Sequence, residues 1–353
     1  MRGGAANGAA RRPALLDVAA RAGVSHQTVS RVLNDSPHVA PATREKVRRA
    51  IDDLGYRRNM SARALATGRS NVIGVIAPSS TLYGPSAIVA GLSRAGRSAS
   101  MTFTVDQLTD LDRPSLHDAV DRLLGHGIAG LLMVLPLDAA AEVVSSVVPA
   151  GIPVVTVDRP QGDDVATVSV DQYAGAVLAT RHLLDQGHET VWHVAGPDDW
   201  NDSRAREAGW RETLAAAGVD EPPVVRGDWS PASGYQAGRT LARMPDCTAV
   251  FAANDHMALG VARALHEAGR AIPGDVGLVG FDGVPESEYF TPPLTTVVQD
   301  FDAVGRAGVE LLIEQIDGPT TSRSVLIAPR LVERASSRRP STGPPDAAGP
   351  SAR

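Results

Sequence analysis

The sequence is poor in cysteine. Its 353 residues include one cysteine, Cys247, which excludes a disulfide framework and any zinc site built from several cysteines. No neighbouring side chain could assist its chemistry, so we expect Cys247 to be a small buried residue. The nine histidines lack the spacing of a metal site, and no phosphate-binding loop is present. The sequence therefore predicts neither a metal nor a cofactor.

Aromatic residues and long apolar runs are scarce as well. Phe, Trp and Tyr make up 4% of the chain, so each of its four tryptophans is informative. No stretch approaches the roughly 18 apolar residues that span a bilayer. The N-terminal residues contain no apolar run typical of a secretory signal. We therefore expect a cytoplasmic protein with no membrane partner.

The chain carries a net charge of -6, which taken alone argues against binding to nucleic acid. The charge is unevenly distributed, however. Residues 1–70 contain 13 basic and 5 acidic side chains, a net charge of +8, while the remaining residues carry -14. A basic segment joined to an acidic body indicates a polyanion-binding module fused to a second domain.

A helix-turn-helix pattern lies in the basic segment. Leu16, Ala19 and Ala20 share one helical face by their spacing, and Gly23 then interrupts the helix. Ser25 offers an N-cap oxygen for a second helix. Two short helices joined by a tight glycine-containing turn are typical of this DNA-binding motif.

The second helix is expected to divide its side chains between two faces. Val29 and Val32 face the first helix, while a polar set faces outward, where this motif meets the major groove. Glutamine can pair with adenine, and arginine with guanine, through two hydrogen bonds. Two solvated helices of an ordinary bundle are the alternative. The outward residues are His26, Gln27, Ser30 and Arg31.

A third helix follows. Pro41 suits its first turn and Gly55 ends it. Its apolar face consists of Val47, Ala50, Ile51 and Leu54. The rest of the helix is basic, and this surface either contacts phosphates or is simply solvated. The basic residues are Arg44, Lys46, Arg48 and Arg49.

Three segments of this region resemble the DNA-binding head and hinge of the LacI/GalR family of bacterial transcription regulators. They are AGVSHQTVSRVLN (22–34), TREKVRRAIDDLGY (43–56) and NMSARALATG (59–68), in the family's order and spacing. Two features depart from the family pattern: Arg57-Arg58 stands where a proline is usual, and Ala40 replaces the usual capping residue of the third helix. The resemblance implies a helix-turn-helix domain over 13–58 and a hinge helix and linker over 59–70.

The resemblance also implies which residues touch DNA. His26, Gln27 and Arg31 would read bases. Leu65, in a hinge helix spanning Asn59–Ala66, would enter the minor groove, where an apolar wedge unstacks one base step and bends the duplex. The full implied set is His26, Gln27, Ser30, Arg31, Asn34, Asn59, Arg63 and Leu65, with Asn34 as a backbone contact.

From Asn71 onward, short apolar runs alternate with helical stretches. The runs predict buried parallel strands, and their number over about 260 residues predicts two doubly wound parallel sheets. In such sheets ligands bind beyond the carboxyl ends of the strands. The predicted strands are 72–78, 101–105, 128–134, 153–157, 191–195, 248–253 and 276–280. The predicted helices include Leu116–Leu124, Ala174–Leu184, Arg204–Ala217 and Met257–Ala268.

Enzyme motifs are missing from this body. Gly125, Gly127 and Gly130 fit G-x-G-x-x-G, but a dinucleotide-binding fingerprint follows a strand and opens a helix. Here the glycines end a helix and precede a strand. G-x-S-x-G, the motif of a hydrolase nucleophile, does not occur. We therefore expect no catalytic residues and no enzymatic activity.

Residues 71–333 resemble the ligand-binding core of the same family, and most closely its lactose-responsive members. The match is carried by YGPSAIVAG (83–91), VLPLDA (134–139), AGPDDWNDSRAREAGW (195–210), GDWSPASGY (227–235), ANDHMALG (253–260) and PPLTTVVQDF (292–301). The implied fold is a small all-α helix-turn-helix head plus an α/β core of two doubly wound parallel-sheet subdomains, like that of periplasmic binding proteins. The N-subdomain would comprise about 71–170 and 301–328, and the C-subdomain about 171–297. Residues 334–353 are rich in Ser, Pro, Gly and Ala, which predicts a disordered tail.

The resemblance implies that a sugar effector binds between the subdomains. An indole stacks on the apolar face of a sugar ring, and Asp, Asn and Arg side chains pair with hydroxyls. Each side chain also has a plainer interpretation: Trp229 as a core residue, Arg206 as a solvated residue, Asp158 and Asp282 as turn formers. The implied effector contacts are Ile88, Asp158, Arg206, Trp229, Asn254, Asp282, Gln299 and Phe301.

The leading hypothesis is a dimeric repressor of a sugar-utilisation operon, which a galactoside or related glycoside releases from a pseudo-palindromic, double-stranded operator. The tail lacks the leucine heptads that join dimers into tetramers in some family members, so we expect a homodimer. The alternatives are a regulator that needs a purine co-repressor, a sugar-binding protein without regulation, and an enzyme on an α/β scaffold. The basic head and the missing catalytic motifs argue against the last two.

Overall fold

The computed structural model describes residues 13–33, 35–57, 70–110, 112–136, 146–157, 165–319 and 322–338. The chain divides into two units, Met1–Ser70 and Asn71–Arg353, each with its own hydrophobic core. Within the described ranges, no helix combines the length and apolar character needed to cross a membrane.

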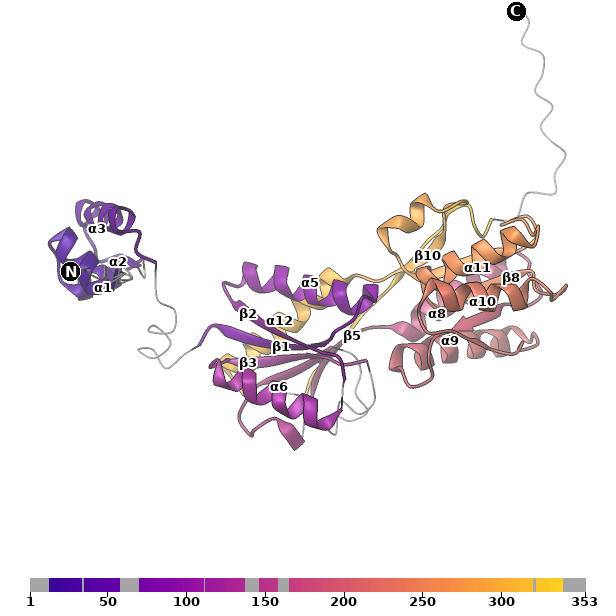
Figure 1. The fold of residues 1–353 in the computed structure, drawn as a ribbon, viewed down its shortest axis with the longest axis horizontal. Helices are drawn as coiled ribbons and strands as arrows, with labels where there is room; N and C mark the ends of the chain where they lie inside the picture. The colour runs from indigo at the N-terminus through magenta and orange to yellow at the C-terminus, as the bar shows by residue number, and fades with distance from the viewer. Residues whose placement is uncertain are drawn as a thin grey trace, which may run out of the picture. The chain divides into compact units, whose positions relative to one another are not determined.

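The described residues of the first unit form three helices (Figure 1): α1 (Leu15–Ala22), α2 (His26–Leu33) and α3 (Pro41–Leu54). Gly23 ends α1 with a φ of 66°, a left-handed conformation that glycine adopts without steric cost. The Ser25 hydroxyl accepts a hydrogen bond from the Thr28 amide at 3.2 Å and so caps α2. The predicted helix-turn-helix and the third helix are confirmed.

The three helices meet in one small core, whose buried members include Val29, Val32, Val47 and Ala50. The predicted face of α1 was wrong by one position. Leu16 is 67% exposed and Ala20 is also exposed, because the buried face of α1 runs through Val18 and Ala19. Both registers fit an i, i+3, i+4 pattern, and the one that buries the β-branched valine is adopted.

The second unit begins with a sheet of six parallel strands in the order β11-β5-β4-β3-β1-β2. The strands are β1 (Val72–Pro78), β2 (Thr102–Leu108), β3 (Gly130–Val134), β4 (Val154–Val157), β5 (Ala166–Val170) and β11 (Ser324–Ile327). Helices α5 (Tyr83–Ser98) and α12 (Phe301–Asp317) cover one face, and α6 (Arg113–Gly125) covers the other. This sheet and its helices are called the first lobe.

A second six-stranded sheet has the order β12-β10-β9-β8-β6-β7, and all its pairs are parallel except β10 with β12. The strands are β6 (Trp192–Ala195), β7 (Val225–Arg226), β8 (Ala249–Ala252), β9 (Gly277–Asp282), β10 (Thr295–Val298) and β12 (Arg330–Val332). Helices α8 (Gln172–Asp185) and α9 (Asn201–Ala217) cover one face, and α10 (Pro231–Leu241) and α11 (Asp255–Glu267) the other. This sheet, its helices and the short helix η1 (Pro285–Tyr289) are called the second lobe.

The chain passes between the lobes at three crossovers. They lead from β5 to α8, from β10 to α12, and from β11 to β12. Each lobe is therefore assembled from segments that are distant in the sequence (Figure 1). The predicted fold class, a helix-turn-helix head with two doubly wound sheets, is confirmed.

Two details of the predicted body were wrong. The segment that forms β2 was predicted to be buried, but β2 lies at the sheet edge and alternates between exposed and covered residues. The core was predicted to end at 333, but Ser336 and Ser337 are buried in the second lobe. The Ser336 hydroxyl donates to the Leu278 carbonyl at 2.6 Å, so hydrogen bonding rather than hydrophobicity holds this polar segment.

Candidate functional site

A cavity of about 610 Å³, including its mouth, lies between the two lobes. The cavity lies beyond strand ends of both sheets, where doubly wound folds bind their ligands. Of the eight residues implied to contact an effector, seven line it: Ile88, Arg206, Trp229, Asn254, Asp282, Gln299 and Phe301. The eighth, Asp158, lies outside the described residues.

Backbone conformation directs three of these side chains. Asn254 directly follows β8 and caps α11, its Oδ1 accepting from the Met257 amide at 2.8 Å. Asp282 is the last residue of β9 and has a φ of 104°, and Trp229, before α10, has a φ of 73°. A non-glycine residue with positive φ costs of order 1–3 kcal/mol, and such strain is concentrated at functional sites. Two strained residues on one cavity mark it as the candidate site.

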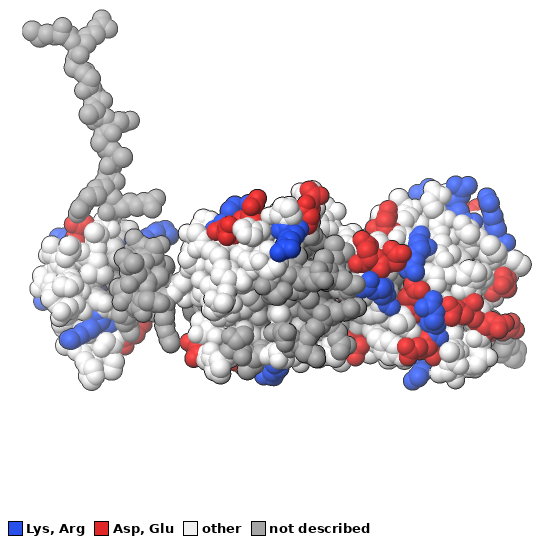
Figure 2. Space-filling model, turned by 90° about the horizontal axis from the view of Figure 1, so that it is seen from below, with Lys and Arg blue, Asp and Glu red and all other residues white. Residues whose placement is uncertain are grey.

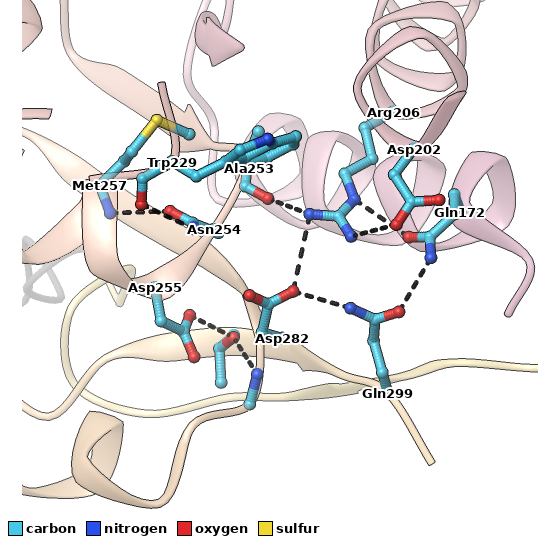
Figure 3. Close-up of polar contacts among 12 residues, drawn as sticks. Gln172, Asp202, Arg206, Trp229, Ala253, Asn254, Asp255, Met257, Asp282 and Gln299 are labelled. Carbon is cyan, nitrogen blue, oxygen red and sulfur yellow. Dashed lines mark hydrogen bonds and ion pairs between the residues drawn. The ribbon is translucent and has the colours of Figure 1, made fainter. Parts of the chain in front are cut away.

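Arg206 is held by several partners and is only 3% exposed (Figure 3). Its Nε donates to Gln172 Oε1 at 3.0 Å, and Nη1 donates to the Ala253 carbonyl. Nη1 also lies 3.6 Å from Asp282 Oδ1, and Nη2 lies 3.5 Å from Asp202 Oδ2. A buried guanidinium requires such partners because it keeps its charge. The interpretation of Arg206 as a solvated surface residue is therefore wrong.

Two carboxyl groups lie buried beside this guanidinium. Burial raises the pKa of Asp282 to about 6, although Arg206 and the amide of Gln299, which donates to Asp282 Oδ1 at 2.7 Å, act in the opposite direction. Burial and the charge of Asp282 also raise the pKa of Asp255 well above its usual value. Asp255, the first residue of α11, accepts from the Thr296 hydroxyl at 2.6 Å and is fully buried. Of these two carboxyl groups, Asp282 is the one that lines the cavity.

Trp229 belongs both to the core and to the cavity wall. It is 5% exposed, and its carbonyl accepts from Asn254 Nδ2 at 3.1 Å. A Cβ added to Gly196 would lie 2.3 Å from the indole, so only glycine allows this close packing. Trp200 meets the indole edge to face, with ring centroids 5.5 Å apart. The indole is packed between Gly196 and Trp200, and its core and cavity interpretations both hold.

The first lobe supplies an apolar wall opposite these polar groups. Tyr83 and Phe301 pack edge to face with centroids 5.8 Å apart, and Ile88 lines the same side of the cavity. An apolar wall facing a guanidinium, a carboxylate and an amide suits a neutral, hydroxyl-rich ring, whose faces are apolar and whose edges form hydrogen bonds.

Three polar or aromatic residues of the cavity lining were not predicted from the sequence: Gln172, Trp200 and Asp202. A signal for Gln172 existed, because it follows the apolar run that forms β5 and so lies at a strand end. That run was not recognised as a strand. Trp200 and Asp202 lie just beyond the polar segment that follows β6, at the start of α9.

The described residues contain no group of three or more His, Cys, Asp or Glu side chains able to hold a metal ion. The single thiol is equally unsuited to chemistry. Cys247 is fully buried, as predicted, and burial raises its pKa to about 12, so the thiol stays protonated.

In the first unit, α2 presents a polar surface. His26, Gln27 and Arg31 are exposed and Ser30 is half-buried. The other residues implied to contact DNA lie outside the described residues; they are Asn34, Asn59, Arg63 and Leu65. A DNA-reading role for the α2 residues is compatible with this exposure.

The basic residues of α3 form ion pairs within the first unit. Arg44 Nη1 lies 3.1 Å from Asp35 Oδ1, and Arg49 Nε lies 3.0 Å from Glu45 Oε1. The N-cap residue Ala40 makes no side-chain capping bond, as its chemistry requires. Exposed pairs of this kind contribute about 0–1 kcal/mol and open easily. Phosphate contact and simple solvation therefore both remain compatible with these side chains.

Two regions of the chain match described protein families. Residues 14–59 match the bacterial regulatory proteins of the lacI family, and residues 180–337 match the periplasmic binding protein-like domain. The chain is also 34% identical to the lactose operon repressor of Escherichia coli (strain K12) over 331 residues. The alignment covers 93% of this chain and 91% of that protein.

Two solved structures share the fold. A crystal structure of the lac repressor dimer bound to operator and the anti-inducer ONPF matches with a TM-score of 0.84 and 33% identity, covering 93% of this chain and 99% of that chain. A complex of the transcriptional regulator CelR with cellobiose matches with a TM-score of 0.69 and 34% identity, covering 92% of this chain and 100% of that chain. The likeness thus extends over both units.

Proposed function

The chain belongs to the lacI family of bacterial regulatory proteins, and from this premise we propose that it represses a sugar-utilisation operon. The first unit binds double-stranded operator DNA, and a sugar in the cavity between the lobes releases it. A lactose operon repressor and a regulator in complex with cellobiose are among the similar proteins, which supports a glycoside effector. The proposed class is a galactoside or a related glycoside such as a β-glucoside.

The pairing of Arg206 with Asp282 beside the indole of Trp229 carries this proposal. Arg206 lies 3.6 Å from Asp282 and 3.5 Å from Asp202, so its charge is already neutralised within the site, and the cavity favours a neutral ligand that both donates and accepts hydrogen bonds. A sugar with neighbouring hydroxyls does both. Asn254 and Gln299 add polar groups to the same wall. Asp158 joins this proposed set by its place in the sequence.

A purine co-repressor is the second candidate within this family. A planar base is best held between parallel aromatic rings. The aromatic pairs of the cavity meet edge to face instead, at interplanar angles of 62° for Trp200 with Trp229 and 71° for Tyr83 with Phe301. This geometry favours a puckered sugar ring over a flat base.

We propose that operator recognition lies on α2 and on the hinge segment that follows the first unit's helices. His26, Gln27, Ser30 and Arg31 read base edges in the major groove, and Asn34 contacts the DNA backbone. Asn59, Arg63 and Leu65 engage the minor groove, with Leu65 as the wedge.

The proposed assembly is a homodimer on a pseudo-palindromic operator, because two-fold protein symmetry matches two half-sites. The repressor seen on its operator in the similar crystal structure is a dimer. We further propose that the chain regulates without catalysis. The cavity offers hydrogen bonds, stacking and the ion pairs of Arg206 with Asp282 and Asp202, which are means of binding and not of bond breaking.

A mobility-shift experiment tests the proposal. The duplex is a palindromic site from DNA upstream of the protein's own gene, and the additives are lactose, cellobiose and guanine. We expect binding without additive and release by at least one of the two sugars. Tightening by guanine would replace the sugar hypothesis by the co-repressor hypothesis, and failure to bind any such site would contradict repression.

A further inference from the structure

Two glutamines lie on the crossovers that connect the lobes. Gln172 is the first residue of α8, directly after the chain leaves β5 of the first lobe. Gln299 lies between β10 of the second lobe and α12 of the first. Both are buried, and Gln172 Nε2 donates to Gln299 Oε1 at 2.9 Å. One amide–amide hydrogen bond therefore joins two of the three crossovers.

This bond is one side of a closed polar ring (Figure 3). Arg206 Nε donates to Gln172 Oε1 at 3.0 Å, and Gln299 Nε2 donates to Asp282 Oδ1 at 2.7 Å. The ring closes where Arg206 Nη1 lies 3.6 Å from the same Asp282 oxygen. Three members, Arg206, Asp282 and Gln299, belong to the proposed sugar-binding set, and the bond from Gln172 to Gln299 connects this set to the crossovers.

The ring has a fixed direction. A guanidinium can only donate hydrogen bonds, and an ionised carboxylate can only accept them. Gln172 must therefore turn its oxygen to Arg206 and its nitrogen to Gln299, and Gln299 must turn its nitrogen to Asp282. Hydrogen bonds in series with charges at both ends strengthen one another in a buried, low-dielectric setting. The orientation of the bridge thus depends on the charged pair.

We propose that the Gln172–Gln299 bridge couples sugar occupancy to the arrangement of the crossovers, with Gln172 as a positioning residue. The inference rests on the proposed function. A sugar hydroxyl that donates to Asp282 and another that accepts from Arg206 compete for the bonds that orient the two amides. The bridge then weakens, and the lobes are free to reorient about the crossovers. The Gln172–Gln299 bond is therefore stronger in the sugar-free state than in the sugar-bound state. Such a difference in bonding between two states is what allosteric coupling requires.

Two substitutions at Gln172 distinguish the role of its hydrogen bond to Gln299 from that of its hydrogen bond to Arg206. Gln172→Met keeps the side-chain length but removes both hydrogen bonds. Gln172→Glu keeps an acceptor for Arg206 Nε, but an ionised carboxylate cannot donate to Gln299. If the bridge is the coupling element, both variants lose the response. If Gln172 only holds Arg206, the glutamate variant retains it.

The measured quantity is the ratio of operator Kd values with and without saturating sugar. The probe is whichever of lactose, cellobiose and isopropyl thiogalactoside releases the unaltered protein. We expect this ratio to fall at least about fivefold in both variants, within the usual span of allosteric coupling. Saturation by sugar is verified for each variant from tryptophan fluorescence, which also shows that the variant is folded. Gln315→Met, at a buried glutamine on α12, is the matched control and should keep the ratio.

A double variant sharpens the test. Gln299→Met also removes the hydrogen bond to Asp282, so Gln172→Met combined with Gln299→Met should lower the ratio by less than the product of the two single effects, because both single changes break the same bridge. An unchanged ratio in Gln172→Met, or a full response in Gln172→Glu, overturns the inference while the proposed function stands. An unaltered protein that responds to none of the three probes overturns the proposed function itself.

Discussion

At the scale of single residues, the cavity depends on side chains whose backbone is held in strained conformations. Trp229 and Asp282 both have positive φ, and each is fixed by neighbours: the amide of Asn254 holds the Trp229 carbonyl, and the amide of Gln299 holds the Asp282 carboxyl. Strain of this kind persists only where the surroundings determine it. The cavity is therefore formed before any ligand arrives.

Removing the indole should abolish the sugar response. We expect Trp229→Ala to weaken sugar binding at least about tenfold, since a stacking platform and its packing are lost together. Operator binding by the first unit should remain, because Trp229 lies in the second lobe. Operator release is measured by mobility shift over a sugar titration. A variant that still releases normally would show that the sugar binds elsewhere.

The raised pKa of Asp282 predicts that sugar affinity depends on pH. The ordinary value of 3.8 is shifted to about 6, so the carboxyl of the free protein takes up a proton below that pH. A sugar hydroxyl that donates to Asp282 favours its ionised form, so affinity should rise as pH increases through 6. We expect the sugar Kd at pH 5 to be about tenfold higher than at pH 7.5.

Fluorescence titrations at a series of pH values measure this dependence. Asp282→Asn should flatten the profile, because its amide does not titrate. Asp300→Asn, at the next crossover position and exposed, should preserve it. A sugar Kd that is constant from pH 5 to 7.5 in the unaltered protein would remove Asp282 from the set of ligand contacts.

Cavity residues could be predicted where the sequence shows the end of a strand as the end of an apolar run. Asn254 and Asp282 follow strongly apolar runs, and Trp229 is one of four tryptophans. Gln172 was missed because its strand, Ala166–Val170, contains Thr and Ser and does not form a continuous apolar run. The buried state of Arg206 was also out of reach, since partners such as Ala253 and Gln172 come from distant parts of the chain.

At the scale of elements, the contact between α5 and α12 is made through glycines. A Cβ added to Gly305 would lie 2.3 Å from the carbonyl carbon of Gly91, a backbone atom that cannot turn aside. We expect Gly305→Ala to lower the free energy of unfolding by about 1–3 kcal/mol, the usual cost of overpacking. Gly125→Ala, where a Cβ meets nothing within 4 Å, is the matched control and should not destabilise. Urea denaturation followed by circular dichroism measures both.

Arg31 on α2 and Lys46 on α3 should act differently on DNA. Arg31 is exposed on the helix expected to enter the major groove, so Arg31→Ala should cost about 1–3 kcal/mol and relax discrimination at one base pair. Lys46 on α3 is proposed to contact phosphates, so Lys46→Ala should weaken binding to all sequences alike. Competition with single-base operator variants distinguishes the two. Equal discrimination in both variants would contradict base reading by Arg31.

Elements were predictable where their pattern was long or strongly apolar. The three helices of the first unit and the strands near 72–78 and 276–280 are examples. The short strands β10, β11 and β12 were missed, because three or four partly exposed or polar residues carry no periodic signal. The pairing of β11 with β5 joins residues over 150 positions apart, and no local pattern encodes such contacts.

At the scale of the whole molecule, the two units divide the charge. The first 70 residues carry +8 and the remainder -14. On the face seen in Figure 2, basic and acidic side chains are interspersed over the second lobe. Arg211 and Arg226 there both pair with Glu207, at 2.8 and 2.6 Å. Paired arginines within a unit of net negative charge do not form the basic surface that a polyanion requires.

This division predicts that salt separates the two binding events. Operator binding displaces counterions from phosphates, so its affinity should fall about 10³-fold or more between 50 and 200 mM KCl. A neutral sugar carries no charge and meets an Arg206 that is already paired with Asp282 and Asp202 inside the protein, so the sugar Kd should change less than about threefold. Mobility shifts and fluorescence titrations at the same salt concentrations give both values. A sugar affinity that falls in parallel with operator affinity would indicate an anionic effector, such as a sugar phosphate, bound by Arg206 in place of its pairing with Asp282.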